Sequence, residues 1–386
     1  MRGDWTDIIR SSRNHKVSDG KFVMLKKLNV IIVIIVAIAG CILTSWIPLF
    51  GYSADHEWRD LNSAEALVLY GVCNVEDVLI VIDPATGAGT EVGPLGIDYV
   101  NGGINFHPDG KLYGLLWNNL YSDYRLYTID LDTGNAFEVG IINIGLSMES
   151  TDLAVDRSGC ILGIVGNKVI DIDRFSGQGT VVFELPSGFD IPSLDFAPDG
   201  NLYAVGDIPT GYGLIKINVG AQTYEILSHL QNLYTGLCHN SSGILFGSDG
   251  DELWIIDPNG GETLIGPIGF HPVNGIDFSP IFQLDVVYGL PYARRGYLTW
   301  WKIALVNSSN DDVIIDRIRF DAYGPVNISK ILFNGAITVP AGSVLSSWIE
   351  LTVSSKAPLG KYKIDTVAEY MSGDIASDLF ELEVVE

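Results

Sequence analysis

The heptapeptide PDGKLYG at Pro108–Gly114 returns ninety residues later as PDGNLYA at Pro198–Ala204. The LYG part of this motif recurs in related form with spacings of 43, 49, 41 and 43 residues. Self-similarity at a nearly fixed period of this size is typical of repeat architectures. The copies are LYG at Leu69–Gly71, LYG at Leu112–Gly114, ILG at Ile161–Gly163, LYA at Leu202–Ala204 and LFG at Leu245–Gly247.

Each repeat contains four short runs of strand-like composition, separated by turns rich in Asp and Gly. In the first repeat a second run, VLIVIDP, ends at Pro84, and the turn Ala85–Gly87 leads to the third run, TEVG. Four such strands repeated every 40 to 50 residues, roughly, predict the blades of a β-propeller in an all-β chain. The last run, GIDFSP at Gly275–Pro280, is expected to supply the strand that the first blade lacks and so to close the ring. We predict five blades over residues 66–281, or six if residues 55–65 add another.

The sequence of the repeats resembles the "DFSPDGxLYxV … LYxIDPxTGxxxxVG" repeats of extracellular propeller proteins, which include NHL-type and quinoprotein-like propellers. This resemblance implies an architecture and no activity, because propeller folds carry lectins, hydrolases, lyases and scaffolds alike.

From Phe282 onward the period stops and longer strand-like runs follow, among them GYLTWWKIALVN and KYKIDTVAEY. Such runs, separated by turns with Asn, Asp, Gly and Pro, predict an immunoglobulin-like β-sandwich over residues 282–386. Trp300 and Trp301 are adjacent, so a strand would direct them to opposite faces, one into the core and the other toward the propeller junction.

The N-terminal region predicts export. Residues 1–27 form a basic tail, and the uncharged, largely apolar segment 28–50 is long enough to span a bilayer, with residues 51–65 as a linker. Because the basic residues lie only before this segment, the tail is expected in the cytoplasm. Three interpretations stay open: an uncleaved transmembrane anchor, a signal peptide starting at Met24 and cleaved near Ala54, and a lipid anchor at Cys41. All place the propeller and sandwich outside the cell, on the membrane or secreted.

Charge and motif composition exclude several functions. The chain has 23 basic and 47 acidic residues, and residues 28–386 carry 16 − 44 = −28 once the seven basic and three acidic residues of the tail are removed. Such an excess repels a phosphate backbone, so nucleic acid is not an expected partner. The sequence has no HExxH, GxSxG or CxxC pattern, and Cys73, Cys160 and Cys238 are widely spaced.

Three acidic residues on the longer connections between blades are candidate functional groups: Asp98, Glu149 and Asp190. If they meet at one mouth of the propeller, their hard oxygen atoms could bind Ca²⁺ as a cofactor. Alternatively, two of them could act as an acid and base pair in glycoside cleavage. The structural alternative is that they are solvated loop residues. They are therefore the candidate catalytic residues of an activity that the sequence does not establish.

The insert LLWNNLYSDYR at Leu115–Arg125 is the candidate ligand-binding segment. Its aromatic and amide side chains could stack on a sugar ring and bond its hydroxyls, or could cover the edge of a blade. The candidate residues are Trp117, Asn118, Tyr121 and Tyr124.

Repeated polar positions have a structural interpretation. Asn105, Asp195 and Asp277 share one column of the innermost run, where channel lining or hydrogen bonds between blades are favoured over a reaction centre. The preferred function is a cell-surface or secreted recognition protein that binds a glycan or a cell-surface protein. The alternatives are a propeller hydrolase or lyase acting on polysaccharide, and a structural component of the cell envelope.

Overall fold

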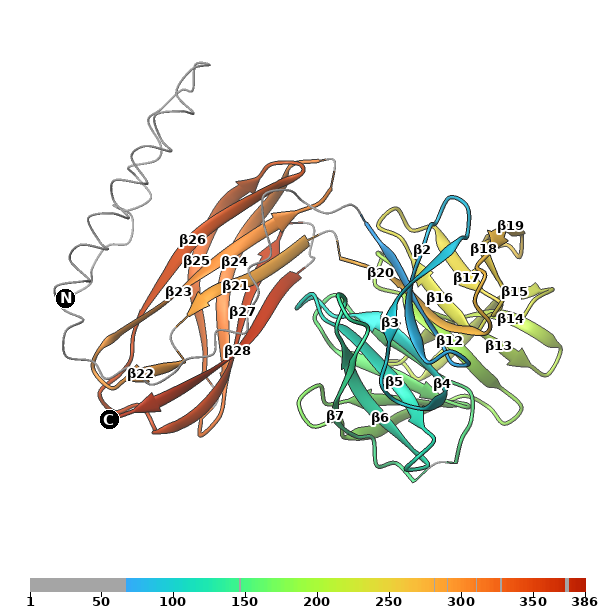
Figure 1. Cartoon of the computed structure of the whole chain (residues 1–386), viewed down its shortest axis with the longest axis horizontal. Coiled ribbons are helices and arrows are strands. Elements are labelled where there is room, and N and C mark those ends of the chain that lie inside the picture. Colours follow the sequence, from blue (N-terminus) through green and yellow to red (C-terminus); the bar gives the residue numbers. More distant parts are fainter. Residues whose placement is uncertain are drawn as a thin grey trace, which may run out of the picture. The chain divides into compact units, whose positions relative to one another are not determined.

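The computed structural model describes residues 67–386 except 146, 281, 290, 310, 327 and 372–374. Regular structure in these residues consists of β-strands, β1 to β28 (Figure 1). Within this described part, no helix is long and apolar enough to cross a membrane. The predicted tail 1–27, membrane segment 28–50 and linker 51–65 lie outside the described residues.

Residues 69–278 form five four-stranded antiparallel sheets. The first has the order β20-β1-β2-β3, with β1 (Leu69–Cys73), β2 (Val78–Ile82), β3 (Gly89–Pro94) and β20 (Val273–Phe278). The second contains β4 (Tyr99–Phe106), β5 (Leu112–Asn118), β6 (Asp123–Ile129) and β7 (Ala136–Ile141). The third contains β8 (Thr151–Val155), β9 (Ile161–Val165), β10 (Lys168–Ile172) and β11 (Gly179–Glu184). The fourth contains β12 (Asp190–Phe196), β13 (Leu202–Ile208), β14 (Gly211–Asn218) and β15 (Thr223–Leu230). The fifth contains β16 (Gly236–His239), β17 (Leu245–Ser248), β18 (Glu252–Ile256) and β19 (Glu262–Pro267).

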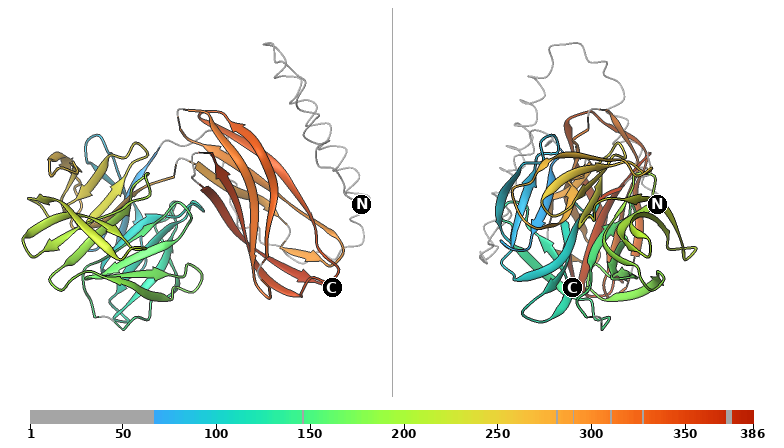
Figure 2. Two further views of the ribbon diagram at one scale, coloured as in Figure 1. Left: turned by 180° about the vertical axis from the view of Figure 1, so that it is seen from behind. Right: turned by 90° about the vertical axis from the view of Figure 1, so that its right-hand side faces the viewer.

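The innermost strands of these sheets form a closed cycle. β4 contacts β8, β8 contacts β12, β12 contacts β16, β16 contacts β20, and β20 returns to β4. The first sheet joins both ends of the repeat region, because β1 pairs with β20 in the register Leu69↔Phe278 and Gly71↔Ile276. This pairing confirms the expected exchange of strands, and the cycle is a β-propeller-like fold (Figure 2).

The glycine of the LYG motif is explained by packing between neighbouring sheets. A Cβ atom at Gly163 would lie 2.8 Å from the Leu115 side chain of the preceding sheet and 2.9 Å from Ile170 of its own. At Gly247 the corresponding distance, to the ring of Tyr234, would be 2.6 Å. Interiors packed at this density leave no room for a methyl group at these two positions, whereas position 204 accommodates the methyl group of Ala.

The Asp residues at the ends of the second runs make turns, as the sequence predicted. Asp83 accepts a hydrogen bond of 2.9 Å from the backbone N–H of Ala85, and the Thr86 hydroxyl donates to its other oxygen. Gly87 then takes a φ of 82°, a conformation that favours glycine. Asp173 makes the same kind of turn with Ser176, which identifies these carboxylates as turn-forming groups.

The C-terminal strands form two sheets that enclose a common core. One has the order β21-β23-β26, with β21 (Phe282–Gly289), β23 (Leu298–Asn307) and β26 (Ser343–Thr352). The other has the order β22-β28-β27-β24-β25, with β22 (Tyr292–Arg294), β24 (Val313–Tyr323), β25 (Ile328–Val339), β27 (Gly360–Tyr370) and β28 (Ile375–Val385). Trp301 is 2% exposed and lies in this core with residues of both sheets, whereas Trp300 packs edge-to-face on Trp348 of the adjacent strand at 5.0 Å. The two tryptophans therefore do point to opposite faces.

Candidate functional site

The connections between strands lie at two ends of the five sheets. Because the strands of each sheet are antiparallel, successive connections alternate between these ends. The PDG turns and the Asp-containing turns such as 83–88 lie at one end, here called the turn face. The connections from one sheet to the next, such as 142–150, lie at the other, here called the loop face, together with hairpins such as 119–122.

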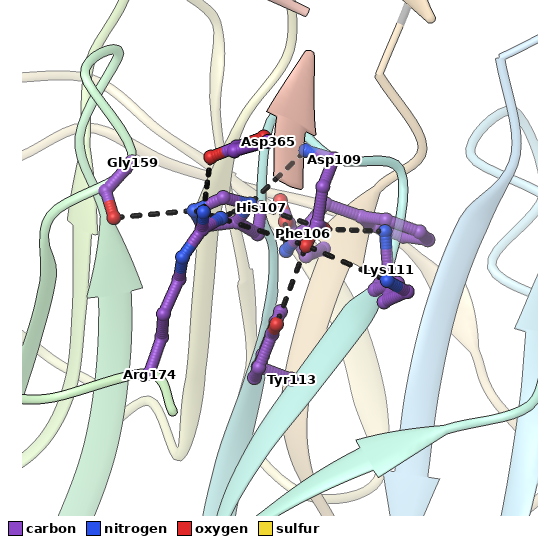
Figure 3. Close-up of polar contacts among 9 residues, drawn as sticks. Phe106, His107, Asp109, Lys111, Tyr113, Gly159, Arg174 and Asp365 are labelled. Atoms are coloured by element: carbon purple, nitrogen blue, oxygen red, sulfur yellow. Dashed lines mark hydrogen bonds and ion pairs between the residues drawn. The ribbon is translucent and has the colours of Figure 1, made fainter. Parts of the chain in front are cut away.

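A buried charge cluster occupies the turn face around Arg174 (Figure 3). The guanidinium of Arg174 is paired with the carboxylate of Asp365 in β27, and its Nη1 lies 3.7 Å from Oδ2 of Asp109 and 3.0 Å from Nε2 of His107. Burial raises the pKa of Asp109, but the charges of His107, Lys111 and Arg174, with the hydrogen bond to His107, outweigh burial and lower that pKa overall. The cluster thus keeps a buried Asp109 anionic and links the turn face to β27.

Two further contacts join the same face to the C-terminal strands. The backbone N–H of Ser377 donates a hydrogen bond of 2.7 Å to the carbonyl of Pro108 in the first PDG turn. The rings of Phe175 and Tyr323 lie 5.1 Å apart. Part of the turn face is therefore used for contacts within the chain.

The polar column of the innermost strands makes hydrogen bonds from one sheet to the next. A side-chain oxygen of Asp277 accepts from the N–H of Phe106 at 2.6 Å, and Asn105 Oδ1 accepts from Val155 at 3.0 Å. Asp152 Oδ2 and Asp195 Oδ2 accept in the same way, from Leu194 at 3.1 Å and His239 at 2.6 Å. The hydrogen bonds between sheets that the sequence suggested for Asn105, Asp195 and Asp277 are therefore present.

Burial changes the acidity of two of these carboxyl groups. It raises the pKa of Asp152 well above the ordinary value, and backbone hydrogen bonds only partly offset this. Burial also raises the pKa of Asp277, and the nearby charge of Asp195 adds to the effect. A neutral carboxyl is thus favoured at both positions, as expected for acids removed from water.

A cavity of about 470 Å³ adjoins this ring of hydrogen bonds on the turn side. Asp195, Asp277 and Asn105 line it, and so does His239, whose Nδ1 lies 2.9 Å from Asp195 Oδ2. Sequence reasoning missed His239, because it tested histidines only for short-range metal or catalytic spacings. The available signal was its position in the repeat, directly after Cys238 in the polar column.

The three candidate loop carboxylates lie on the loop face in different environments. Asp98 is exposed and accepts a hydrogen bond of 3.1 Å from the side chain of Asn119. The Tyr124 hydroxyl donates to the carbonyl of Glu149 at 2.6 Å and accepts from its N–H at 2.7 Å, and the hydroxyl of Ser150 donates to Asp190 at 2.9 Å. Burial raises the pKa of Tyr124 to about 12, and the charges of Glu149 and Asp190 add to the rise. Asp190 is thus bonded to Ser150, the residue after Glu149, while Asp98 is bonded to the 119–122 hairpin.

Metal coordination receives no geometric support from the part of the chain that the structure describes. In residues 67–386, outside the gaps, no group of three or more His, Cys, Asp or Glu side chains is arranged to hold a metal ion.

The aromatic insert is mostly internal. Trp117 and Tyr124 are buried and pack edge-to-face with ring centres 4.8 Å apart. Asn118 is buried as well, where it donates to the hydroxyl of Tyr127 and accepts from the backbone of the β5–β6 hairpin. Of the four candidate ligand-binding residues, Tyr121 is exposed, and its ring lies 3.9 Å from the guanidinium carbon of Arg125.

Exposed apolar side chains lie on neighbouring connections of the loop face and at the start of β4. This surface, here called the loop patch, consists of Val75, Val100, Leu120, Tyr121 and Met148. Hydrogen bonds tie its connections together: the Asn74 side chain donates to the carbonyl of Val100 at 2.5 Å, Asn119 N–H donates to the carbonyl of Asp98 at 3.0 Å, and the Asn101 side chain donates to the carbonyl of Glu149 at 2.6 Å. The loop patch is therefore a preformed surface.

Comparisons with known proteins find similarity in structure only. Neither a protein-family description nor the sequence of a curated protein matches the chain. A chain of the nidogen/laminin complex is 12% identical with a TM-score of 0.40, and the match covers 63% of this chain and 89% of that one. A gluconolactonase from Xanthomonas campestris is 16% identical with a TM-score of 0.36, covering 54% and 79%. TolB from Acinetobacter baumannii is 12% identical with a TM-score of 0.37, covering 73% and 66%. All three are distant, so the β-propeller-like fold rests on the closed cycle of sheets in this chain.

Proposed function

We propose that the protein is a non-enzymatic recognition protein and that its loop patch binds a protein partner. The observation that carries this proposal is the exposure of large apolar side chains on several connections of one face. Leu120 is 77% exposed, Val75 69%, Tyr121 57% and Met148 53%. Clustered apolar exposure of this kind marks interaction surfaces, whereas single exposed residues need no explanation.

The charge around the loop patch specifies the partner further. The patch is flanked by carboxylates of the loop-face connections, among them Glu76, Asp98 and Glu149. A depression of about 460 Å³ begins at Glu76, next to Val75, and its lining combines the carboxylates of Glu76, Asp249, Asp251 and Glu252 with the ring of Phe270. Complementary charge accelerates association and selects partners, so the expected partner presents basic side chains around an apolar centre.

A protein partner agrees better with the insert than a glycan does. Stacking on a sugar ring needs accessible aromatic faces, and Trp117 and Tyr124 are buried against each other. Tyr121, which is exposed, lies in the loop patch and is supported by Arg125. Tyrosine and arginine are enriched where protein surfaces bind one another.

The rest of the proposal concerns architecture and location. We assign the five sheets as the five blades of a propeller and the two C-terminal sheets as an immunoglobulin-like sandwich. We assign the segment 28–50 as the membrane anchor that displays both outside the cell. In this arrangement the contacts around Arg174 fix the turn face to β27 and leave the loop face for the partner.

The test is photocrosslinking with the full chain on intact cells of its own host. A benzophenone amino acid at position 120 is expected to yield one discrete crosslinked protein. The same group at position 244 is the control, because Ile244 is also exposed but lies on the turn face. Equal products at both positions, or none at position 120, would reject the loop patch as the binding surface.

A further inference from the structure

The cavity on the turn side of the central ring has a buried polar floor and walls that mix apolar with polar side chains. Asn105, Asp195 and Asp277 in the floor are each less than 8% exposed, and the side chain of His239 is 5% exposed. The walls include the rings of Phe106, Phe196 and Phe278, the prolines Pro198 and Pro280 of two connections, and polar side chains such as Asp156, Arg157 and Asn240 near the rim. Small-molecule sites combine apolar surface with convergent polar groups, both of which are present here, and about 470 Å³ lies within the common range of volumes.

Hydrogen bonds determine which atom of His239 can meet a ligand. Asn105 Oδ1 accepts from Val155 N–H, so the amide group of Asn105 donates to Asp195 Oδ1 at 3.1 Å. Asp195 Oδ2 accepts from the backbone N–H of His239 at 2.6 Å and lies 2.9 Å from His239 Nδ1. Because Asp195 thus accepts at both oxygens, Nδ1 of His239 carries a proton and donates it to this hydrogen bond.

The remaining ring nitrogen, Nε2, is the hydrogen-bonding atom of His239 that is left for a ligand. Among the described residues it has no hydrogen-bond partner, and the histidine lines the cavity. Contact with the ring of Tyr203, 5.2 Å away, and the bond to Asp195 hold the imidazole in this orientation. In the neutral imidazole Nε2 is an acceptor, so it is matched by an O–H donor.

We propose that this cavity binds a small molecule consisting of an apolar ring with a hydroxyl group, and that the hydroxyl donates a hydrogen bond to Nε2 of His239. The ring packs among Phe106, Phe196 and Phe278. This site lies at the opposite end of the sheets from the loop patch, and it does not depend on the function proposed for that patch.

The test compares two probes that differ in one hydroxyl group, p-cresol and toluene. Binding to the full chain in lipid nanodiscs is measured by calorimetry, with protein-free nanodiscs as the blank. A hydrogen bond formed in a buried site predicts that wild-type protein binds p-cresol about tenfold more tightly than toluene. His239→Phe keeps an aromatic ring of similar size and is expected to remove this preference while retaining toluene.

A matched control and a second variant complete the design. His229→Phe changes an exposed histidine that contacts Thr210 on the loop face, and the preference for p-cresol should persist in it. Ala197→Leu fills the cavity from a residue of its wall and should abolish binding of both probes. If His239→Phe does not fold, the proposal is tested by the preference of the wild-type protein for p-cresol and by the loss of binding of both probes in Ala197→Leu. No binding of either probe, equal binding of both to wild type, or an unchanged preference in His239→Phe would overturn the proposal.

Discussion

The side chain of Asn105 in β4 donates a hydrogen bond of 3.1 Å to Asp195 in β12, although the sheets of these strands are separated by a third sheet in the ring. The bond therefore reaches across the centre of the cycle. It joins the two residues whose remaining oxygens hold β8 and β16. The centre at this level is a layer of hydrogen-bonded polar side chains, and the cavity of about 470 Å³ adjoins it on the turn side.

The buried carboxyls of this layer predict that stability declines as the pH rises. A raised pKa means that the folded protein holds the proton more tightly than the unfolded chain, so the contribution is complete below the ordinary value of 3.8. This contribution to stability is lost as the pH rises through the raised pKa values. The total loss is about 1.4 kcal/mol for each unit by which folding raises the pKa. Urea unfolding of wild type and Asp277→Asn across the neutral range measures this. The variant should show a shallower decline, and parallel curves would contradict the assignment.

Gly103 in β4 predicts a severe effect of a single methyl group. A Cβ atom there would overlap the carboxylate of Asp152 and lie 3.2 Å from its Cα, inside the layer just described. Gly103→Ala should therefore lower the free energy of unfolding by about 3 kcal/mol, or prevent folding. Gly220→Ala is the control, because the nearest atom there would be 3.7 Å away, and it should be neutral or slightly stabilising. Equal midpoints in thermal unfolding would show that the inner strands can separate at little cost.

Arg174 predicts a large loss of stability when its charge is removed. Arg174→Met leaves the buried carboxylate of Asp365 without its cation and removes one of the cations beside Asp109, and breaking a buried pair in this way typically costs roughly 3–5 kcal/mol. Arg294→Met replaces an exposed arginine of β22 and should change stability by no more than about 0.5 kcal/mol. Chemical unfolding of the two variants is the measurement. Similar midpoints would mean that the cluster contributes little.

The loop patch predicts that partner binding and stability can be separated. Leu120 is exposed, so Leu120→Ser should change the free energy of unfolding by no more than about 0.5 kcal/mol. The same variant should reduce crosslinking from a neighbouring position. Glu76→Gln should slow association, with the largest effect at low salt, since exposed charges act mainly on the rate of encounter. Association measured by surface plasmon resonance at several salt concentrations would test this, once the partner is captured. An association rate that does not depend on salt would remove charge from the recognition model.

The fold was predictable from the sequence because the residues that favour strands and turns lie within each repeat. The LYG run, the Asp turn and the Gly-containing PDG turn fix strand ends, and the offset between the first and last runs revealed the pairing of β1 with β20. The two adjacent tryptophans also behaved as a strand requires, but Trp300 packs on Trp348 of β26. That contact depends on which strand lies beside β23, and the spacing of runs does not carry this information.

The candidate sites were less predictable, because exposure is decided by neighbours distant in sequence. Trp117 and Tyr124 looked like surface aromatics within a polar insert, yet their positions on β5 and β6 place them opposite one another in register and inside the sheet packing. His239 acquires its role from Asp195, 44 residues earlier and in another sheet. The repeats in the sequence reveal a column of polar residues. They do not reveal in which direction each side chain of that column points.

The pairing of β1 with β20 also has a consequence for the order in which this protein can be made. The backbone N–H of Val68 donates a hydrogen bond to the side chain of Ser279, 211 residues away. The edge of β1 therefore stays unpaired until nearly the whole repeat region has been synthesised. Contacts of such sequence separation form slowly, and an unpaired strand edge is prone to associate with other chains in the meantime. A fragment that stops before residue 273 would therefore be vulnerable to aggregation and proteolysis, and the vulnerability would end once the six residues Val273–Phe278 have been made and have left the ribosome.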